Sequence, residues 1–156
     1  MTTVIIKDKT SSLFSAVRKL TKTAVLVGIP ESENARDDGP IGNATIGYLN
    51  ETGSPSQNIP ARPHLVPGIE DAKDQIVKQF RRAAQAAMEG KNTAPGLNGA
   101  GQAGATGVQQ RITDGPFEPL SPRTLEARKR AGRTGEKPLM DKGDYRSRIT
   151  YVLREP

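Results

Sequence analysis

Apolar residues along the chain gather in a few short runs, and three of these runs predict β-strands. Residues 23–29 (TAVLVGI) form the most apolar run, and Lys22 and Pro30 bound it, which favours a buried strand over a short helix. Residues 4–6 (VII) and residues 148–153 (RITYVL) are rich in the β-branched and aromatic side chains that strands favour. We expect the strand at 23–29 to pair with one of these two segments.

Other apolar positions recur every three or four residues and predict helices. The clearest pattern covers residues 69–88, where apolar side chains alternate with charges at helical spacing. We place its apolar stripe, which includes Phe80, in the core. A short helix is expected around residues 13–20, and another over residues 44–50, ending before Gly53, which can take a left-handed conformation.

The segments between these helices are rich in glycine, proline and charge. Residues 31–43 predict a loop at a sheet edge, and the four prolines within residues 54–68 predict a rigid extended connector. Residues 90–107, which are mostly glycine and alanine, are typical of a flexible linker, although Val108 and Ile112 could belong to a second helix.

Residues 116–143 carry repeated proline, glycine and charge, so we expect most of this stretch to be mobile. It contains one short helix, expected over residues 121–128. There Ser121 would cap the helix and Pro122 would take the first helical position.

Together these patterns predict one domain over residues 1–156, of the α+β class: a small antiparallel sheet packed against one long helix, with extended Pro/Gly-rich loops or arms. The Gly/Ala-rich segment 90–107 and a mobile arm over residues 114–145 lie within it. Hydrophobic residues make up 34% of the chain and aromatic residues 4%, which predicts one modest core. No apolar run is long enough to span a bilayer and the start lacks a signal-peptide pattern, so we expect no membrane partner and no secretion.

Candidate catalytic and metal-binding residues are few. The chain has no cysteine, and His64 is its only histidine, so we expect His64 to be structural or to lie at the surface. The glycines of residues 96–107 contain no phosphate-binding G-x-x-x-x-G-K-[ST] pattern. We therefore expect no enzymatic activity, no cofactor and no metal. Four aspartates are expected to be solvated rather than to form a carboxylate site: Asp37, Asp38, Asp71 and Asp74.

Basic residues exceed acidic ones, giving a net charge of +6 and a pI of about 9.8, which favours a polyanionic partner. The densest basic run is Arg128, Lys129 and Arg130, followed by Arg133 and Lys137. Phosphate contacts need only clustered cations, but no aromatic side chains are interleaved for base stacking. The run therefore favours a solvated or protein-contacting loop, and a nucleic-acid site remains the alternative.

Three segments resemble, in order along the chain, the tail-completion or virion morphogenesis proteins of Mu-like and other long-tailed bacteriophages. Residues 46–53 (IGYLNETG) and 59–65 (IPARPHL) are similar to that family's aromatic-x-x-Glu-x-Gly and Pro-Ala-Arg-Pro-aromatic-Leu patterns, with His64 at the position of the large aromatic residue. Residues 114–125 (DGPFEPLSPRTL) are similar to its Pro-Leu-Ser-Pro-x-Thr stretch. Residues 137–151 (KPLMDKGDYRSRITY) are similar to its Lys-Pro-Leu-x-Asp-x-Gly element.

This resemblance implies a structural protein of the phage neck, made in the host cytoplasm and located in the virion, with no enzymatic role. It implies a homo-oligomeric ring between the head–tail adaptor and the tail tube or terminator proteins, with DNA passing through the lumen without sequence-specific binding. A basic nucleic-acid-binding protein and a tail terminator subunit remain alternatives. The residues expected to contact neighbours are Glu51, Gly53, Arg62, Pro63, His64, Leu120, Pro122, Arg123, Arg128, Lys129, Arg130, Lys137 and Pro138.

Overall fold

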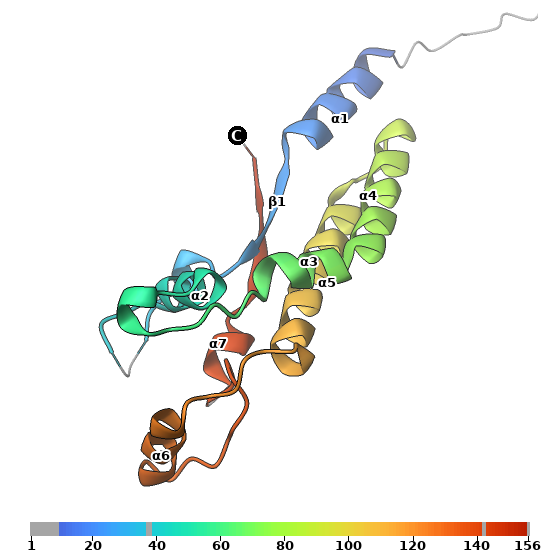
Figure 1. Cartoon of the computed structure of the whole chain (residues 1–156). Coiled ribbons are helices and arrows are strands. Elements are labelled where there is room, and N and C mark those ends of the chain that lie inside the picture. Colours follow the sequence, from blue (N-terminus) through green and yellow to red (C-terminus); the bar gives the residue numbers. More distant parts are fainter. Residues whose placement is uncertain (1–9, 37–38, 142, 156) are drawn as a thin grey trace, which may run out of the picture.

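The computed structural model describes residues 10–36, 39–141 and 143–155 and combines helices with one small sheet, which confirms the expected fold class (Figure 1). The strand expected at residues 4–6 lies outside the described residues. The elements in chain order are α1 (Thr10–Lys22), β1 (Ala24–Gly28), the 3-10 turn η1 (Glu31–Glu33), α2 (Asn43–Thr52), the 3-10 turn η2 (Pro55–Gln57), α3 (Leu65–Asp71), α4 (Lys73–Met88), α5 (Ala94–Asp114), α6 (Pro122–Arg130), α7 (Asp144–Ser147) and β2 (Thr150–Arg154).

The sheet joins the strand predicted at residues 23–29 to the strand predicted at residues 148–153. β1 and β2 run antiparallel, with Val27 opposite Tyr151 and Leu26 opposite Val152. Successive side chains point to opposite faces of a strand. Val27 and Tyr151 face α5, whereas Leu26 and Val152, 44% and 42% exposed, lie on the outer face. Of the two partners expected for the strand at 23–29, the described residues show pairing with the C-terminal one.

The long helix that packs on the sheet is α5, and this corrects two predictions. Residues 90–107, expected as a flexible linker, are largely helical, and α5 rather than the 69–88 helix contacts both strands. Glycine costs about 1 kcal/mol relative to alanine inside a helix, but it lets another backbone come close. A Cβ at Gly96 would lie 2.6 Å from the backbone nitrogen of Ala83 in α4, and one at Gly107 would collide with the carbonyl of Gly68 in α3.

The helix expected over residues 69–88 is divided in two. The backbone leaves helical geometry at Ala72, which ends α3 and begins α4. α3 starts earlier than expected, at Leu65, and includes Pro67 in its first turn, where a missing N–H costs no helical hydrogen bond. The extended connector therefore ends before residue 65 rather than at residue 68. Packing joins α4 to α5 and to α1.

The predicted ends of two shorter helices are confirmed. α2 stops at Gly53, whose φ of 75° lies in the left-handed region and whose N–H bonds the carbonyl of Leu49. α6 begins as expected, because the side chain of Ser121 accepts a hydrogen bond from the backbone N–H of Thr124 and Pro122 takes the first position.

The core is small and lies where α5, α7 and the sheet meet. Its buried cluster consists of Val108, Ile112, Tyr145 and Ile149. Ala83 and Ala87 of α4 are fully buried, as expected from their stripe, but Phe80, which was placed in the core, is 40% exposed. The expectation of one modest core is consistent with this short list of buried side chains.

The molecule is elongated, with α1 at one end and α6 at the other (Figure 1). Its accessible surface is 11009 Å², whereas a compact monomer of 16.7 kDa would expose about 7600 Å². The undescribed residues account for only part of this excess, because they would expose at most about 2000 Å² even as a free chain. Much of the surface is therefore open for contact with other molecules.

Candidate interaction site

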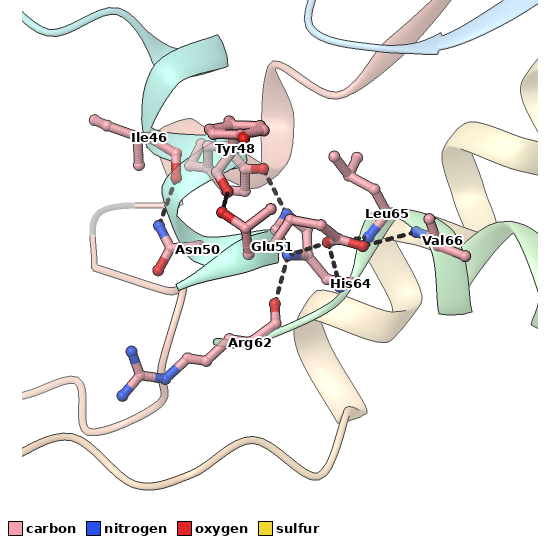
Figure 2. A network of polar contacts seen from close by, with 10 residues as sticks. Ile46, Tyr48, Asn50, Glu51, Arg62, His64, Leu65 and Val66 are labelled. Carbon is pink, nitrogen blue, oxygen red and sulfur yellow. Dashed lines mark hydrogen bonds and ion pairs between the residues drawn. The ribbon is translucent and has the colours of Figure 1, made fainter. Parts of the chain in front are cut away.

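The carboxylate of Glu51, at the end of α2, organises the start of α3. Its Oε2 accepts hydrogen bonds from the backbone N–H groups of His64 and Leu65 at 2.7 and 2.8 Å, and its Oε1 accepts one from Val66 at 3.1 Å (Figure 2). These N–H groups have no partner within the helix, and the positive end of the helix dipole favours an anion there. Glu51 therefore joins α2 to α3 and fixes the angle between them.

The side chain of His64 is fully buried and joins the same turn to α7. Its Nδ1 lies 2.8 Å from the carbonyl oxygen of Arg62 and its Nε2 lies 2.5 Å from the hydroxyl of Tyr145. The two rings meet edge to face, with centroids 5.5 Å apart. His64 is thus structural, and the alternative that it lies at the surface is wrong.

Burial sets the protonation of this cluster. It lowers the pKa of His64 below its usual value, although the Arg62 carbonyl and the charge of Glu51 act in the opposite direction. A neutral ring has one donor and one acceptor, so Nδ1–H donates to the Arg62 carbonyl and Nε2 accepts from the Tyr145 hydroxyl. Burial also raises the pKa of Tyr145, so this hydroxyl keeps its proton.

Glu51 is the charged member of the cluster. Its burial acts to raise the pKa of the carboxyl, but the three backbone N–H groups of residues 64–66 outweigh that effect, and the pKa falls below its usual value. The cluster therefore combines a carboxylate, a neutral imidazole and a neutral phenol.

Arg62 connects this turn to the segment before α6. Its side chain is buried, and its Nε and Nη2 donate to the carbonyl oxygens of Glu118 and Pro119 at 3.2 and 3.4 Å. Its backbone N–H donates to the carbonyl of Asn50. Arg62, which was expected to contact a partner, instead binds two parts of its own chain together.

Arg128 binds the segment after α6 to the rest of the chain in the same way, through main-chain carbonyl groups. This corrects the interpretation of the basic run, in which Arg128 was expected to be solvated or to contact a partner. Its guanidinium is mostly buried, with Nη1 donating to the carbonyl oxygens of Gly135, Lys137 and Met140 at 2.7, 3.2 and 3.1 Å. Asp141 lies 3.6 Å from its Nε. Arg128 is therefore not available to a phosphate or to a partner. Its neighbours Lys129 and Arg130 are exposed.

Two segments expected to contact partners line one groove of about 640 Å³. One wall comes from residues 52–62 and the other from residues 118–124. Gly53, Arg62 and Leu120 are the expected contact residues that line it. The remaining ones lie outside the groove: Pro63, Pro122, Arg123 and Lys137 are exposed and Pro138 is half-buried.

The internal roles of Glu51, Arg62 and Arg128 were missed at the sequence level, whereas a structural role was one of the two expected for His64. One signal could have found the first three. Each is a charged residue within or beside a proline-rich or glycine-rich stretch, where many carbonyl and N–H groups lack helical partners. Tyr145, the partner of His64, lies 81 residues further along the chain and gave no signal of this pairing.

The described residues contain no group of three or more His, Cys, Asp or Glu side chains placed to hold a metal ion. Within the same part of the chain, no helix combines the length and the hydropathy needed to cross a bilayer. The described residues instead form a bonded polar cluster of Glu51, Arg62, His64 and Tyr145, which we call the joint. A groove lies beside the joint, and the helix α6 exposes Lys129 and Arg130.

Comparisons with protein-family models, with curated proteins and with solved structures found no match for this chain.

Proposed function

We propose that this protein is a structural subunit of a bacteriophage virion, acting at the neck as a tail-completion or head–tail joining protein. The observation that carries the proposal is that the three segments resembling that family converge. Within the first segment the backbone N–H of His64 donates to Glu51. The ring of His64 bonds to Tyr145 of the third segment, and Arg62 donates to carbonyl groups of the second.

The surface around this joint supports a contact role. The groove between residues 52–62 and 118–124 is built from proline-fixed main chain, which loses little conformational entropy when a partner binds. Its walls are held by Arg62, so the groove is pre-formed. Such a surface suits a neighbouring protein of fixed shape.

A ring of identical subunits follows from the same proposal. A rotational ring needs two different patches on each subunit, and an elongated chain with a large exposed surface can supply both while a third region contacts the adaptor. In this arrangement the groove and α6 meet neighbouring subunits or the adaptor, and DNA passes through the lumen without base-specific contacts.

The test is a nonsense mutation in this gene within the phage that carries it. We expect filled heads and finished tails to accumulate unjoined, counted by negative-stain electron microscopy, and expression of the protein from a plasmid to restore whole particles. Normal yields of joined virions from the mutant would overturn the proposal.

The same lysate separates this role from that of a tail terminator. A terminator limits tail growth, so its loss gives tails of irregular length, whereas loss of a joining subunit leaves tail length uniform. Mass spectrometry of purified virions and of tail-less heads adds the location of the subunit.

The alternative of a nucleic-acid-binding protein loses one of its main residues, because the guanidinium of Arg128 is bonded to its own chain. A gel shift with duplex DNA at moderate salt tests it directly. We expect no stable complex. Tight binding that is abolished by Lys129→Ala/Arg130→Ala would favour the alternative.

A further inference from the structure

The net positive charge of the protein is concentrated in α1 and α4. α1 carries Arg18, Lys19 and Lys22 and no acidic residue, and α4 carries four basic residues against one acidic residue. These two helices therefore account for the whole net charge of +6, because the other 16 basic residues of the chain are matched by 16 acidic ones. The rest of the molecule is neutral on balance.

Most of these charges have no ion pair with the acidic residues that the structure describes. Lys19 pairs with Glu155 at 3.3 Å. Within the described ranges, the ion pairs include none made by the other basic side chains of the two helices, namely Arg18, Lys22, Lys73, Lys78, Arg81 and Arg82.

The same two helices expose large apolar side chains. On α4, Val77, Phe80 and Met88 are 36%, 40% and 66% exposed, and their spacing places them on one stripe. On α1, Phe14 is 69% exposed, with Leu13 and Val17 more than one third exposed. α1 and α4 are in contact, and we call their exposed apolar side chains, together with the cations of the two helices, the α1/α4 face.

The described residues of the chain cover α1 only in part, through α4. None of its 13 residues is buried, and a helix of about that length is only marginally stable in water without packing. Its regular apolar stripe would be stabilised by contact with another apolar surface.

We propose that the α1/α4 face docks an acidic, amphipathic segment of another protein, one that presents apolar side chains flanked by Asp and Glu. The apolar stripe of the face would bury those apolar side chains, while its cations would pair with the carboxylates. The inference goes beyond the neck assignment and does not depend on it, because it rests on the charge and exposure of two helices outside the three resembling segments.

The charge and the apolar stripe of the face argue against two other occupants. A second copy of the face would bring two strongly basic surfaces together, which like-charge repulsion opposes. Duplex DNA would pair with the cations but would leave Phe14 and the α4 stripe against phosphates, with no apolar surface to cover them. An anionic bilayer would satisfy both charge and stripe, and it is therefore tested beside the peptide.

The experiment uses the full chain and a synthetic 18-residue helical peptide with leucine on one face and glutamate on the other. A peptide with lysine in place of every glutamate is the charge control. Binding is followed by fluorescence anisotropy. We expect the glutamate peptide to bind at least about tenfold more tightly than the lysine peptide, as charge complementarity requires.

Two variants and two matched controls locate the binding. Phe14→Ser and Arg18→Glu/Arg81→Glu should each weaken binding of the glutamate peptide about tenfold or more. Tyr48→Ser removes an equally exposed aromatic side chain from α2, and Lys129→Glu/Arg130→Glu makes the same charge change on α6. Both controls should bind within about twofold of wild type, and thermal unfolding checks that each variant is folded.

Four results would overturn the proposal. The first is binding unaffected by the α1/α4 variants, and the second is a lysine peptide that binds as well as the glutamate peptide. The third is tighter binding of duplex DNA or of phosphatidylglycerol vesicles with the same sensitivity to Phe14→Ser. The fourth is self-association of the protein that this substitution abolishes.

Discussion

At the scale of single residues, the carboxylate of Glu51 accepts three backbone N–H groups with its two oxygens. In Glu51→Gln one of those oxygens becomes an amide nitrogen that faces N–H donors. We expect the free energy of unfolding to fall by about 1–2 kcal/mol, measured by urea denaturation. Glu70→Gln, an exposed change on α3, should shift it by less than about 0.5 kcal/mol. Equal effects of the two substitutions would contradict this role of Glu51.

His64 predicts how stability depends on pH. Its pKa in the folded chain lies below the value of 6.5 for the free side chain, so the unfolded chain binds more protons. The free energy of unfolding should therefore be highest above about pH 7 and should fall as the pH drops below about 6.5, by at most about 1.4 kcal/mol per pH unit. Glu51, whose pKa is also lowered, adds a further loss at more acid pH.

Because His64 is the only histidine, one substitution isolates this effect. His64→Gln retains a donor and an acceptor but does not titrate. Urea denaturation between pH 5.5 and 7.5 should show the slope in wild type and a much smaller one in this variant. A slope of the same size in both would rule out His64 as its source.

The residue types of the candidate site were largely identified from the sequence, but their roles were not. Glu51, Arg62 and Arg128 were expected to face partners, yet all three bind main-chain groups of their own chain. The reason is that an irregular segment leaves many carbonyl and N–H groups without regular partners. Which charged side chain satisfies them depends on distant contacts that periodicity does not encode.

At the scale of the elements, the glycines of α5 set how closely the helices approach. A Cβ at Gly96 would lie 2.8 Å from the Cα of Ala83, a backbone atom, whereas one at Gly99 would meet only the end of the Gln79 side chain. We expect Gly96→Ala to destabilise the protein by about 1–3 kcal/mol. Gly99→Ala should be neutral or stabilising by up to about 1 kcal/mol, because alanine favours helix. Thermal unfolding of both variants tests this, and a stabilising Gly96→Ala would contradict the packing.

The strands and four of the helices could be predicted because their apolar spacing and end signals agree. β1, β2, α1, α2, α4 and α6 all lie within the ranges expected for them or extend those ranges by a few residues. The end of α5, with Val108 and Ile112, was given as a possible helix. Its glycine-rich part was missed because glycine disfavours helix locally, and packing against α3, α4 and the sheet offsets that cost. Such a tertiary effect leaves no trace in local propensity.

At the scale of the whole molecule, the elongated shape predicts solution behaviour. A compact chain of 156 residues would have a radius of gyration of about 15 Å. We expect the dilute monomer to give a clearly larger value in small-angle X-ray scattering coupled to size exclusion. A variant lacking residues 1–9 is the control, because it removes any contribution from that segment. A value near 15 Å for this variant would contradict the separation of α1 from α6.

The anchoring of the 114–145 arm has a consequence for how this protein can evolve. Arg62 and Arg128 hold the arm through main-chain carbonyls, which every amino acid possesses. The side chains at those positions can therefore change without removing the anchors. Descendants of this gene could acquire a new partner by altering the other exposed residues of the arm, while Arg62 outside the arm and Arg128 within it preserve its path. Divergence should accordingly be fast along the arm and slow at Arg62 and Arg128.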